Sequence, residues 1–163
     1  MKSYVPAVLA LLIAGQAQAA EPQLEFAFEE VVTLAANVPV GTTALGGRNI
    51  VPITGGTFSG PGIAGKVMPG GWDWQLRRAD GCLQIKADYM LQTDDGTIIN
   101  VLNQGVSCPP EPGRASGVRT FPVFEVPMGK YGWLAKDAFV GILVPETQPG
   151  GVRSVRIRFY RVK

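Results

Sequence analysis

The 163-residue chain carries 15 lysine and arginine residues against 13 aspartate and glutamate residues, a formal net charge of +2 at pH 7. A charge so near neutral gives no case for binding nucleic acid or a strongly charged membrane surface. The chain has no histidine, which excludes Ser-His-Asp and Cys-His catalysis and most zinc and non-haem iron sites. No metal or cofactor motif is present, so we expect neither, and acid–base chemistry must use carboxylates, tyrosine, lysine or a thiol.

Residues 1–20 have the layout of a cleavable secretory signal. Lys2 precedes an apolar run from Val8 to Ala14, and a small-x-small cleavage site follows at 17–19. Neither this run nor any later one is long enough to cross a bilayer. No cysteine follows the cleavage region to carry a lipid anchor. We therefore expect an exported protein, periplasmic or secreted and without a membrane anchor, whose residues 21–163 form a single domain.

Alternating apolar and polar residues predict strands at both ends of the mature chain. Residues 24–32 place Leu24, Phe26 and Phe28 against glutamates, and residues 154–162 place apolar side chains against arginines. A period of two is typical of half-buried antiparallel strands. Five basic residues gather near the C-terminus: Arg153, Arg156, Arg158, Arg161 and Lys163. Because most of them alternate, we interpret this cluster as the solvent-facing side of the last strand.

Turn signals separate the other apolar runs, and a helical turn is expected at most once, near 130–139. Many short strands joined by glycine and proline turns predict an all-β sandwich or barrel. Residues 60–65 match G-x-G-x-x-G, but a proline and two glycines follow closely, so no helix can begin there to bind a dinucleotide. We interpret these glycines as tight bends or bulges in curved strands.

Cys82 and Cys108 are the only two cysteines, and in an exported protein the default expectation is a disulfide. Suppose that 94–96 form a three-residue hairpin loop with Gly96 in the left-handed conformation. Thr93 then faces Thr97, and the resulting register matches the apolar faces of both strands and places Cys82 opposite Cys108. A reactive thiol is the alternative, but no C-x-x-C motif or helix N-terminus is present to lower a thiol pKa.

Asp73 lies between Trp72 and Trp74, and the turn after this strand decides which side chains face the interior. With a two-residue turn, Trp72 faces Tyr89 and both tryptophans point inward, leaving Asp73 outside. With a three-residue loop, Asp73 points inward and the tryptophans point out. Burial of large apolar side chains, worth about 1.5–3 kcal/mol each, favours the two-residue turn. A bulge after the glycines at 70–71 could still bring Asp73 to a rim.

Several motifs in order resemble a family of unknown function, DUF3237, found in bacteria and fungi. The run from Gly47 to Gly105 carries most of the resemblance, and "FPVFE" (121–125), "YGWL" (131–134) and "FVG" (139–141) continue it. The resemblance implies a single small antiparallel β-barrel, similar to the allene oxide cyclase and calycin-like barrels. It also implies that some fungal relatives act as cyclases on small aromatic or phenolic intermediates.

The polar or aromatic positions that match the family are Asp73, Trp74, Tyr89, Asn103 and Glu125. The chain departs from the family at Trp72, where a small residue is common, and at Asp88, where a basic residue is common. A bulky Trp72 could narrow the barrel mouth, so a ligand that other members accept need not fit this chain.

Two hypotheses follow. The first is a cofactor-free isomerase, cyclase or lyase in which Asp73 or Glu125 is the acid or base, while Tyr89 and Asn103 stabilise an oxyanion. The second is a carrier that binds one small, partly aromatic ligand inside the barrel without reaction. The expected ligand-binding residues are Trp72, Trp74, Tyr89, Asn103, Tyr131 and Trp133. An edge strand near 154–162 would also permit a homo-oligomer.

Overall fold

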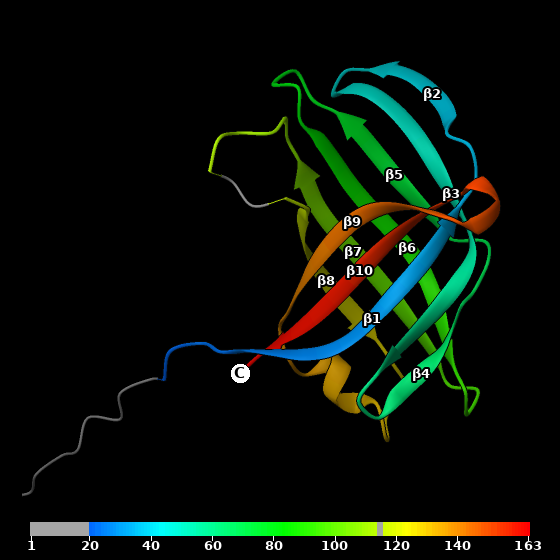
Figure 1. The fold of residues 1–163 in the computed structure, drawn as a ribbon, viewed down its shortest axis with the longest axis vertical. Helices are drawn as coiled ribbons and strands as arrows, with labels where there is room; N and C mark the ends of the chain where they lie inside the picture. Colours follow the sequence, from blue (N-terminus) through cyan, green and yellow to red (C-terminus); the bar gives the residue numbers. More distant parts are fainter. Residues whose placement is uncertain (1–19, 114–115) are drawn as a thin grey trace, which may run out of the picture.

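The computed structural model describes residues 20–113 and 116–163, and almost all of its regular structure is antiparallel sheet (Figure 1). Residues 1–19 of the expected signal segment lie outside the described residues. The strands are β1 (Leu24–Leu34), β2 (Val38–Thr43), β3 (Gly46–Gly60), β4 (Ile63–Val67), β5 (Trp72–Arg77), β6 (Leu83–Thr93), β7 (Ile98–Ser107), β8 (Val118–Glu125), β9 (Phe139–Gln148) and β10 (Val152–Val162). Two short 3-10 helices, η1 (Gly132–Ala135) and η2 (Pro149–Gly151), join strands near the end of the chain.

The strands close into an eight-position antiparallel barrel, which confirms the predicted fold class. Around the barrel the order is β1, β10, β9, β8, β7 and β6, and β3 returns to pair with β1. Two short strands, β4 and β5, share the position between β6 and β3: β4 pairs with one half of β3 and β5 pairs with the other half. The hairpin of β2 and β3 extends beyond the ring at one end (Figure 1). The glycine-rich segment at 60–65 is the tight turn between β3 and β4, as expected.

The hairpin of β6 and β7 has the predicted register. Leu83 pairs with Ser107, and the pairing runs without a shift to Gln92 and Ile98. The loop keeps Gly96 at a φ of 85°, and the Thr93 N–H donates to the Thr97 carbonyl at 3.0 Å. Because the register holds to the far end of the hairpin, Cys82 and Cys108 meet there and form the predicted disulfide.

The register predicted for β5 and β6 is wrong. Trp72 pairs with Asp88 and Asp73 pairs with Ala87, as the three-residue loop would require. The interior face of β5 is therefore the face of Asp73, and both tryptophans point outward. Trp72 is 49% exposed, and Trp74 lies beneath the guanidinium of Arg48 at 5.1 Å. The burial argument failed because the inner face of this strand borders a cavity instead of a packed core, while the outer face is partly covered, with Leu76 buried and Trp74 beneath Arg48.

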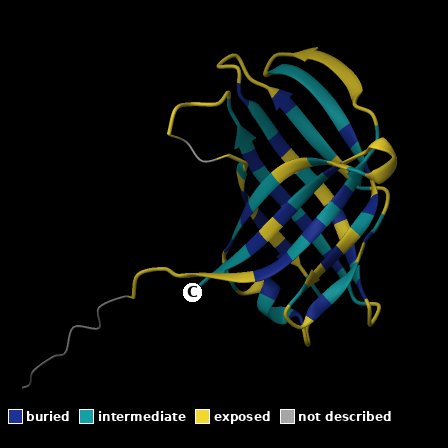
Figure 2. Cartoon of the chain, viewed as in Figure 1, coloured by how far each residue is buried: buried dark blue, intermediate teal, exposed yellow. Residues whose placement is uncertain are grey.

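Buried and exposed residues alternate along most strands (Figure 2), but the barrel interior is filled unevenly. One half holds an aromatic cluster in which Phe28, Phe124 and Phe159 are mutual neighbours with ring centroids 5.0–5.8 Å apart. The 3-10 helix η1 lies over this end of the barrel, at the bottom of Figure 1. The other half is open, and the candidate functional site lies there.

Candidate functional site

A cavity of about 490 Å³ occupies the open half of the barrel. Its volume falls within the range of small-molecule sites in proteins. Most of the wall is apolar and is formed by Val32, Val51, Ile53, Ile85, Ala87 and Ile157. About half of the lining residues carry polar side chains, including Asp73, Gln75 and Asn103, so the cavity suits a small molecule with both apolar and polar groups.

One row of inward side chains crosses four adjacent strands and brings two predicted site residues together. Val51 pairs with Asp73, Asp73 with Ala87, and Ala87 with Asn103. Asp73 and Asn103 are therefore two strand spacings apart, roughly 10 Å between Cα atoms. The small Ala87 between them leaves space, so a carboxylate and a carboxamide face the same volume of the cavity.

The Asp73 carboxylate is held by two hydrogen bonds. Gln75 Nε2 donates to Oδ2 at 2.6 Å, and the backbone N–H of Lys86 donates to Oδ1 at 2.8 Å. Asn49 Nδ2 in turn donates to Gln75 Oε1 at 3.0 Å, which fixes the Gln75 amide. Burial raises the pKa of Asp73, and the two hydrogen bonds oppose that shift. Asp73 is thus a fixed carboxylate with increased basicity, as a general base requires.

Asn103 is 1% exposed and lines the cavity, yet its Oδ1 has no hydrogen-bond partner among the described residues. A buried polar atom without a partner costs roughly 1–3 kcal/mol. Such an atom at a cavity wall is a ready acceptor for a bound hydroxyl or N–H group. The Asn103 side chain can therefore accept a hydrogen bond from a molecule in the cavity.

Tyr89 links the cavity to the packed half, and its partner is a residue that the sequence analysis missed. Its hydroxyl makes a short hydrogen bond with Oε1 of Glu30, a side chain that is fully buried. Burial raises the pKa of Glu30 to about 8, while burial and the neighbouring carboxyl raise that of Tyr89 well above its ordinary value. Tyr89 fits because the facing residue is Gly71, where a Cβ atom would lie 2.5 Å from the Tyr89 Cβ.

The sequence held a signal for Glu30. A shift in pairing between Phe26 and Phe28 turns Phe26 outward and Phe28 inward. From Phe28 the inward positions continue through Glu30 to Val32, and all three are buried. A glutamate at an inward position between two apolar residues marks a candidate site, but the glutamates of this strand were all interpreted as its polar face.

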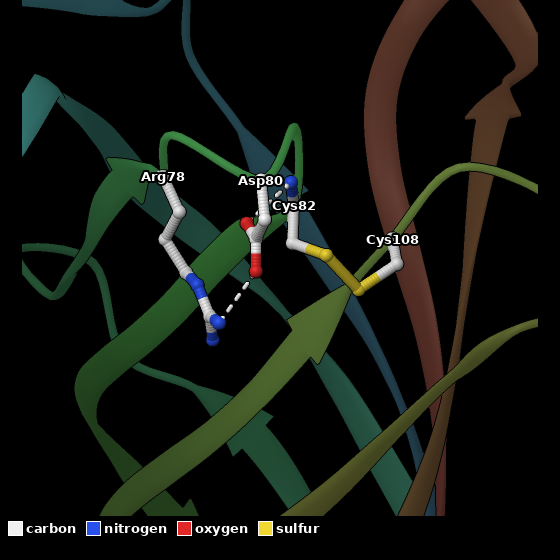
Figure 3. The surroundings of a disulfide bond; sticks show 4 residues. All are labelled: Arg78, Asp80, Cys82 and Cys108. Carbon is white, nitrogen blue, oxygen red and sulfur yellow. Dashed lines mark hydrogen bonds and ion pairs between the residues drawn. A yellow bond between two sulfur atoms is a disulfide. The ribbon is translucent and has the colours of Figure 1, made fainter.

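The mouth of the cavity carries two arginines, Arg77 at the end of β5 and Arg153 at the start of β10. The disulfide joins the ends of β6 and β7 at the same end of the barrel (Figure 3). Beside it, Asp80 Oδ1 accepts the Cys82 N–H at 3.1 Å, and the Asp80 carboxylate binds Arg78 at 2.6 Å. These contacts hold the loop that follows Arg77.

The other predicted site residues lie away from the cavity. Trp72, Trp74 and Glu125 are on the outer face, where Glu125 is exposed and pairs with Asn100. Tyr131 and Trp133 are at the packed end: the Tyr131 hydroxyl donates to Asp95 at 2.9 Å, and Trp133 packs against the ring of Phe139. Of the predicted residues, the structure brings only Asp73, Tyr89 and Asn103 to the cavity wall.

The basic cluster near the C-terminus is mostly an outer surface, as interpreted. Arg156 and Arg158 both bind Glu29, and Arg161 binds Asp137 at 2.7 Å. Arg153 is one exception, because it lines the cavity mouth, and Arg161 is another, because its guanidinium lies over the Trp133 ring at the packed end. In residues 20–113 and 116–163 there is no group of three or more metal-ligating side chains. The same residues include no helix of the length and hydrophobicity that a membrane span needs.

Comparison with other proteins agrees with the fold and the resemblance. The family model described as "Protein of unknown function (DUF3237)" matches residues 22–162. A UPF0311 protein of Clostridium acetobutylicum is 31% identical over 157 residues, covering 85% of this chain and 95% of that protein. The crystal structure of a β-barrel-like protein from Acinetobacter baumannii is 30% identical, with a TM-score of 0.77 over 91% of this chain and all of that one.

A more distant relative is the hydroalkoxylation enzyme of Penicillium herquei. It is 28% identical over 113 residues, which cover 69% of this chain and 68% of that enzyme. The crystal structure of an enzyme from the same fungus has a TM-score of 0.66 and 23% identity over 90% of this chain and 98% of that one. This last similarity is one of fold.

Proposed function

This chain belongs to the DUF3237 family, and from that premise we propose that it is a cofactor-free acid–base enzyme that isomerises or cyclises a small, partly aromatic molecule inside its barrel. The observation that carries the proposal is the meeting of Asp73, Asn103 and the Glu30–Tyr89 pair at one cavity. A base, an oxyanion donor and an apolar wall are the parts that such a reaction requires.

The relative from Penicillium herquei, a hydroalkoxylation enzyme, suggests the reaction class. In hydroalkoxylation an O–H group adds across a C=C bond, so an intramolecular case gives a cyclic isomer with no atom gained or lost. When the C=C bond is conjugated to a carbonyl, the reaction needs a base for the hydroxyl proton, stabilisation of the enolate oxygen, and a proton for the carbon next to the carbonyl.

Asp73 is suited to move the proton. Its carboxylate would accept the hydroxyl proton, the oxygen would form a bond to the far alkene carbon, and Asp73 would return the proton to the carbon beside the carbonyl. Charge and atoms balance without a second reactant. Because the pKa of Asp73 is raised, the carboxylate accepts a proton more readily than an exposed aspartate does.

Tyr89 is suited to stabilise the enolate oxygen. Since the pKa of Glu30 is raised to about 8, Glu30 remains protonated near neutral pH. In the structure the Tyr89 hydroxyl donates to Glu30. A protonated Glu30 can donate to the Tyr89 oxygen instead, and the Tyr89 hydroxyl is then free to donate to the ligand. Asn103 lies on the neighbouring strand and offers its amide to the same volume. Donors placed in advance around a developing negative charge are a large source of rate enhancement.

A suitable test is the conversion of 2′-hydroxychalcone to flavanone, an intramolecular addition of a phenol to a conjugated alkene. We expect the wild-type chain to accelerate it, and Asp73→Asn to lower the rate about 10²-fold or more. Tyr89→Phe should lower it about tenfold to 10²-fold. The matched control is Asp88→Asn, since Asp88 lies on the outer face and accepts a hydrogen bond from Asn100 at 2.8 Å.

Rates should be compared only among variants with wild-type melting temperatures. If Asp88→Asn lowers the rate as far as Asp73→Asn, the proposed site is wrong. If the wild type binds the chalcone but converts it no faster than buffer, the chain is a carrier. That alternative is favoured by the largely apolar wall of the cavity, which suits retention of a ligand as well as reaction.

We also infer that the protein acts outside the cytoplasm, in the periplasm or the medium. The signal layout of residues 1–20 supports this, and so does the disulfide, since such bonds persist mainly in oxidising compartments. Mass spectrometry of the protein from fractionated cells tests it. We expect a mature N-terminus near residue 20 or 21, and an intact N-terminus in the cytoplasmic fraction would contradict it.

A further inference from the structure

Some charged residues of the cavity have a partner of opposite charge and others do not, and the unpaired ones indicate the charge of the ligand. Four charged side chains line the cavity: Asp73, Arg77, Glu146 and Arg153. Asp73 lies inside and is bound by Gln75 and by backbone. Glu146 lies at the mouth, but its carboxylate is bound by Arg156 at 2.6 Å, so its charge is compensated. The two remaining charges at the mouth are both guanidinium groups.

Neither of these arginines forms an ion pair within the described part of the chain. The Arg77 guanidinium makes no hydrogen bond there either, although Arg78, the next residue, is bound to Asp80. Arg153 Nη1 donates to the Ala35 carbonyl and to Asn37 Oδ1, at 3.3 and 3.1 Å. These contacts position Arg153 but leave its charge uncompensated and its other N–H groups free.

The placement of these arginines fits one kind of ligand group. Arg77 follows Asp73 by four residues on the same face of β5, which places their Cα atoms roughly 13 Å apart along the cavity wall. A ligand that fills the cavity can therefore meet Asp73 at one end and Arg77 at the other. A guanidinium binds a planar carboxylate through two parallel hydrogen bonds.

We propose that the substrate is an aromatic carboxylic acid, bound through its carboxylate by Arg77 and Arg153 at the mouth while its rings extend toward Asp73 and Tyr89. This inference concerns the cavity of the proposed function and names its substrate class. It also assigns Arg77 a role in specificity. With Asp73 counted against Arg77 and Arg153, and Glu146 paired with Arg156, the cavity keeps one net positive charge, which suits a monoanion.

Matched pairs of acid and amide test the inference by binding alone. The probes are 2-naphthoate with 2-naphthamide and benzoate with benzamide, which have similar shapes and differ in charge. We expect the wild type to bind at least one acid about tenfold more tightly than its amide, since charge-assisted hydrogen bonds are the stronger kind. Isothermal titration calorimetry measures the two affinities, and the preference should fall as salt is added.

Arg77→Gln should remove most of this preference, Arg153→Gln should reduce it, and Arg77→Lys should keep part of it. Arg158→Gln is the matched control, because Arg158 lies on the outer face of β10 and binds Glu29, and it should leave the preference unchanged. The inference is overturned if wild type shows no preference for either acid, including the case of no binding at millimolar concentration, or if Arg77→Gln and Arg153→Gln both keep it. Acid binding without turnover of any substrate would refute the proposed enzyme but keep the carboxylate site at Arg77 and Arg153. Turnover of neutral phenols without any preference for the acid would keep the enzyme and refute the carboxylate site.

Discussion

The two halves of this barrel are built from the same strands but filled in opposite ways. On β6, Leu91 is completely buried in the packed half, while Ile85 faces the cavity in the open half. The packed half contains interlocking aromatic rings, and the open half contains a carboxylate, carboxamides and empty volume. The Glu30–Tyr89 pair lies between them, since Tyr89 both lines the cavity and belongs to the apolar core.

This difference shows how a small barrel can hold a polar site. Closing the sheet and packing one end fixes the strands, so the other end can retain a cavity and polar atoms without partners. Stability and function are then concentrated in different layers of one core. If stability depends mainly on the packed half and ligand binding on the open half, substitutions in the two halves should have different effects.

The largest effect is expected from truncating the packed half. Leu91→Ala should lower the free energy of unfolding by about 3–4 kcal/mol, because the removed atoms leave a void that neighbours cannot fill. Ile85→Ala on the same strand should cost only about 1–2 kcal/mol, because that side chain already borders open volume. Urea denaturation of both variants measures the contrast. Equal losses would mean that the open half is packed as tightly as the closed half.

The disulfide is expected to stabilise the open half. Replacing Cys82 and Cys108 with alanine should cost about 3.5 kcal/mol by the chain-entropy estimate for a sequence separation of 26 residues. Hydrogen exchange should accelerate first at the neighbouring ends of β5, β6 and β7. Exchange in the aromatic half should change only through global unfolding, so equal acceleration at both ends would show that the barrel opens as one unit.

The boundary between the halves should make stability depend on pH. Because the pKa of Glu30 is about 8 in the fold and near 4.3 in the unfolded chain, the folded protein binds more protons than the unfolded one between these values. Stability should therefore fall as pH rises from about 4.5 to 8, and level off above that. The same burial raises the pKa of Asp73, so both carboxyls act in the same direction.

Glu30→Gln isolates the contribution of Glu30, since the amide offers Tyr89 both an acceptor and a donor, as a protonated carboxyl does, but cannot ionise. The variant should lose most of that pH dependence, a difference on the order of 3 kcal/mol between pH 5 and pH 9. Chemical denaturation at a series of pH values gives both curves. Parallel curves for wild type and variant would show that Glu30 is already ionised between pH 5 and pH 9. Glu30 could then not be the protonated partner that the proposed role of Tyr89 requires.

The residue pattern was sufficient for an all-β sandwich or barrel and for one hairpin register, and the family resemblance selected the barrel. Applying the same loop to both hairpins would have given the second register. Both loops end in Asp-Gly, and Gly81 and Gly96 have φ values of 80° and 85°. In each loop the aspartate accepts the N–H of the residue after the glycine. The three-residue loop was applied to β6–β7 but not to β5–β6, where burial of the tryptophans was given more weight.

Other parts of the site depend on the fold alone. Glu30 and Tyr89 are 59 residues apart, and their contact follows from closure of the barrel, which brings β1 opposite β6. No local pattern predicts that pairing. Strict alternation from Phe28 does place Glu30 on the inward face; what it cannot show is the shift after Phe26, which leaves Leu24 and Phe26 facing outward. Arg153 was interpreted as solvent-facing together with its basic neighbours. It lies two residues before Val155, however, and therefore on the same, inward face of β10.

The smallest effect is expected on the outer face of the open half. Trp74 packs under Arg48, so Trp74→Ala should cost about 1 kcal/mol, from a partly exposed cation–π contact and some apolar area. Ligand affinity should stay within about twofold of wild type, because the side chain faces away from the cavity. Calorimetry with 2-naphthoate and a melting curve measure the two quantities. A tenfold loss of affinity at wild-type stability would mean that the outer face takes part in binding, and that the interior of the open half is not the whole site.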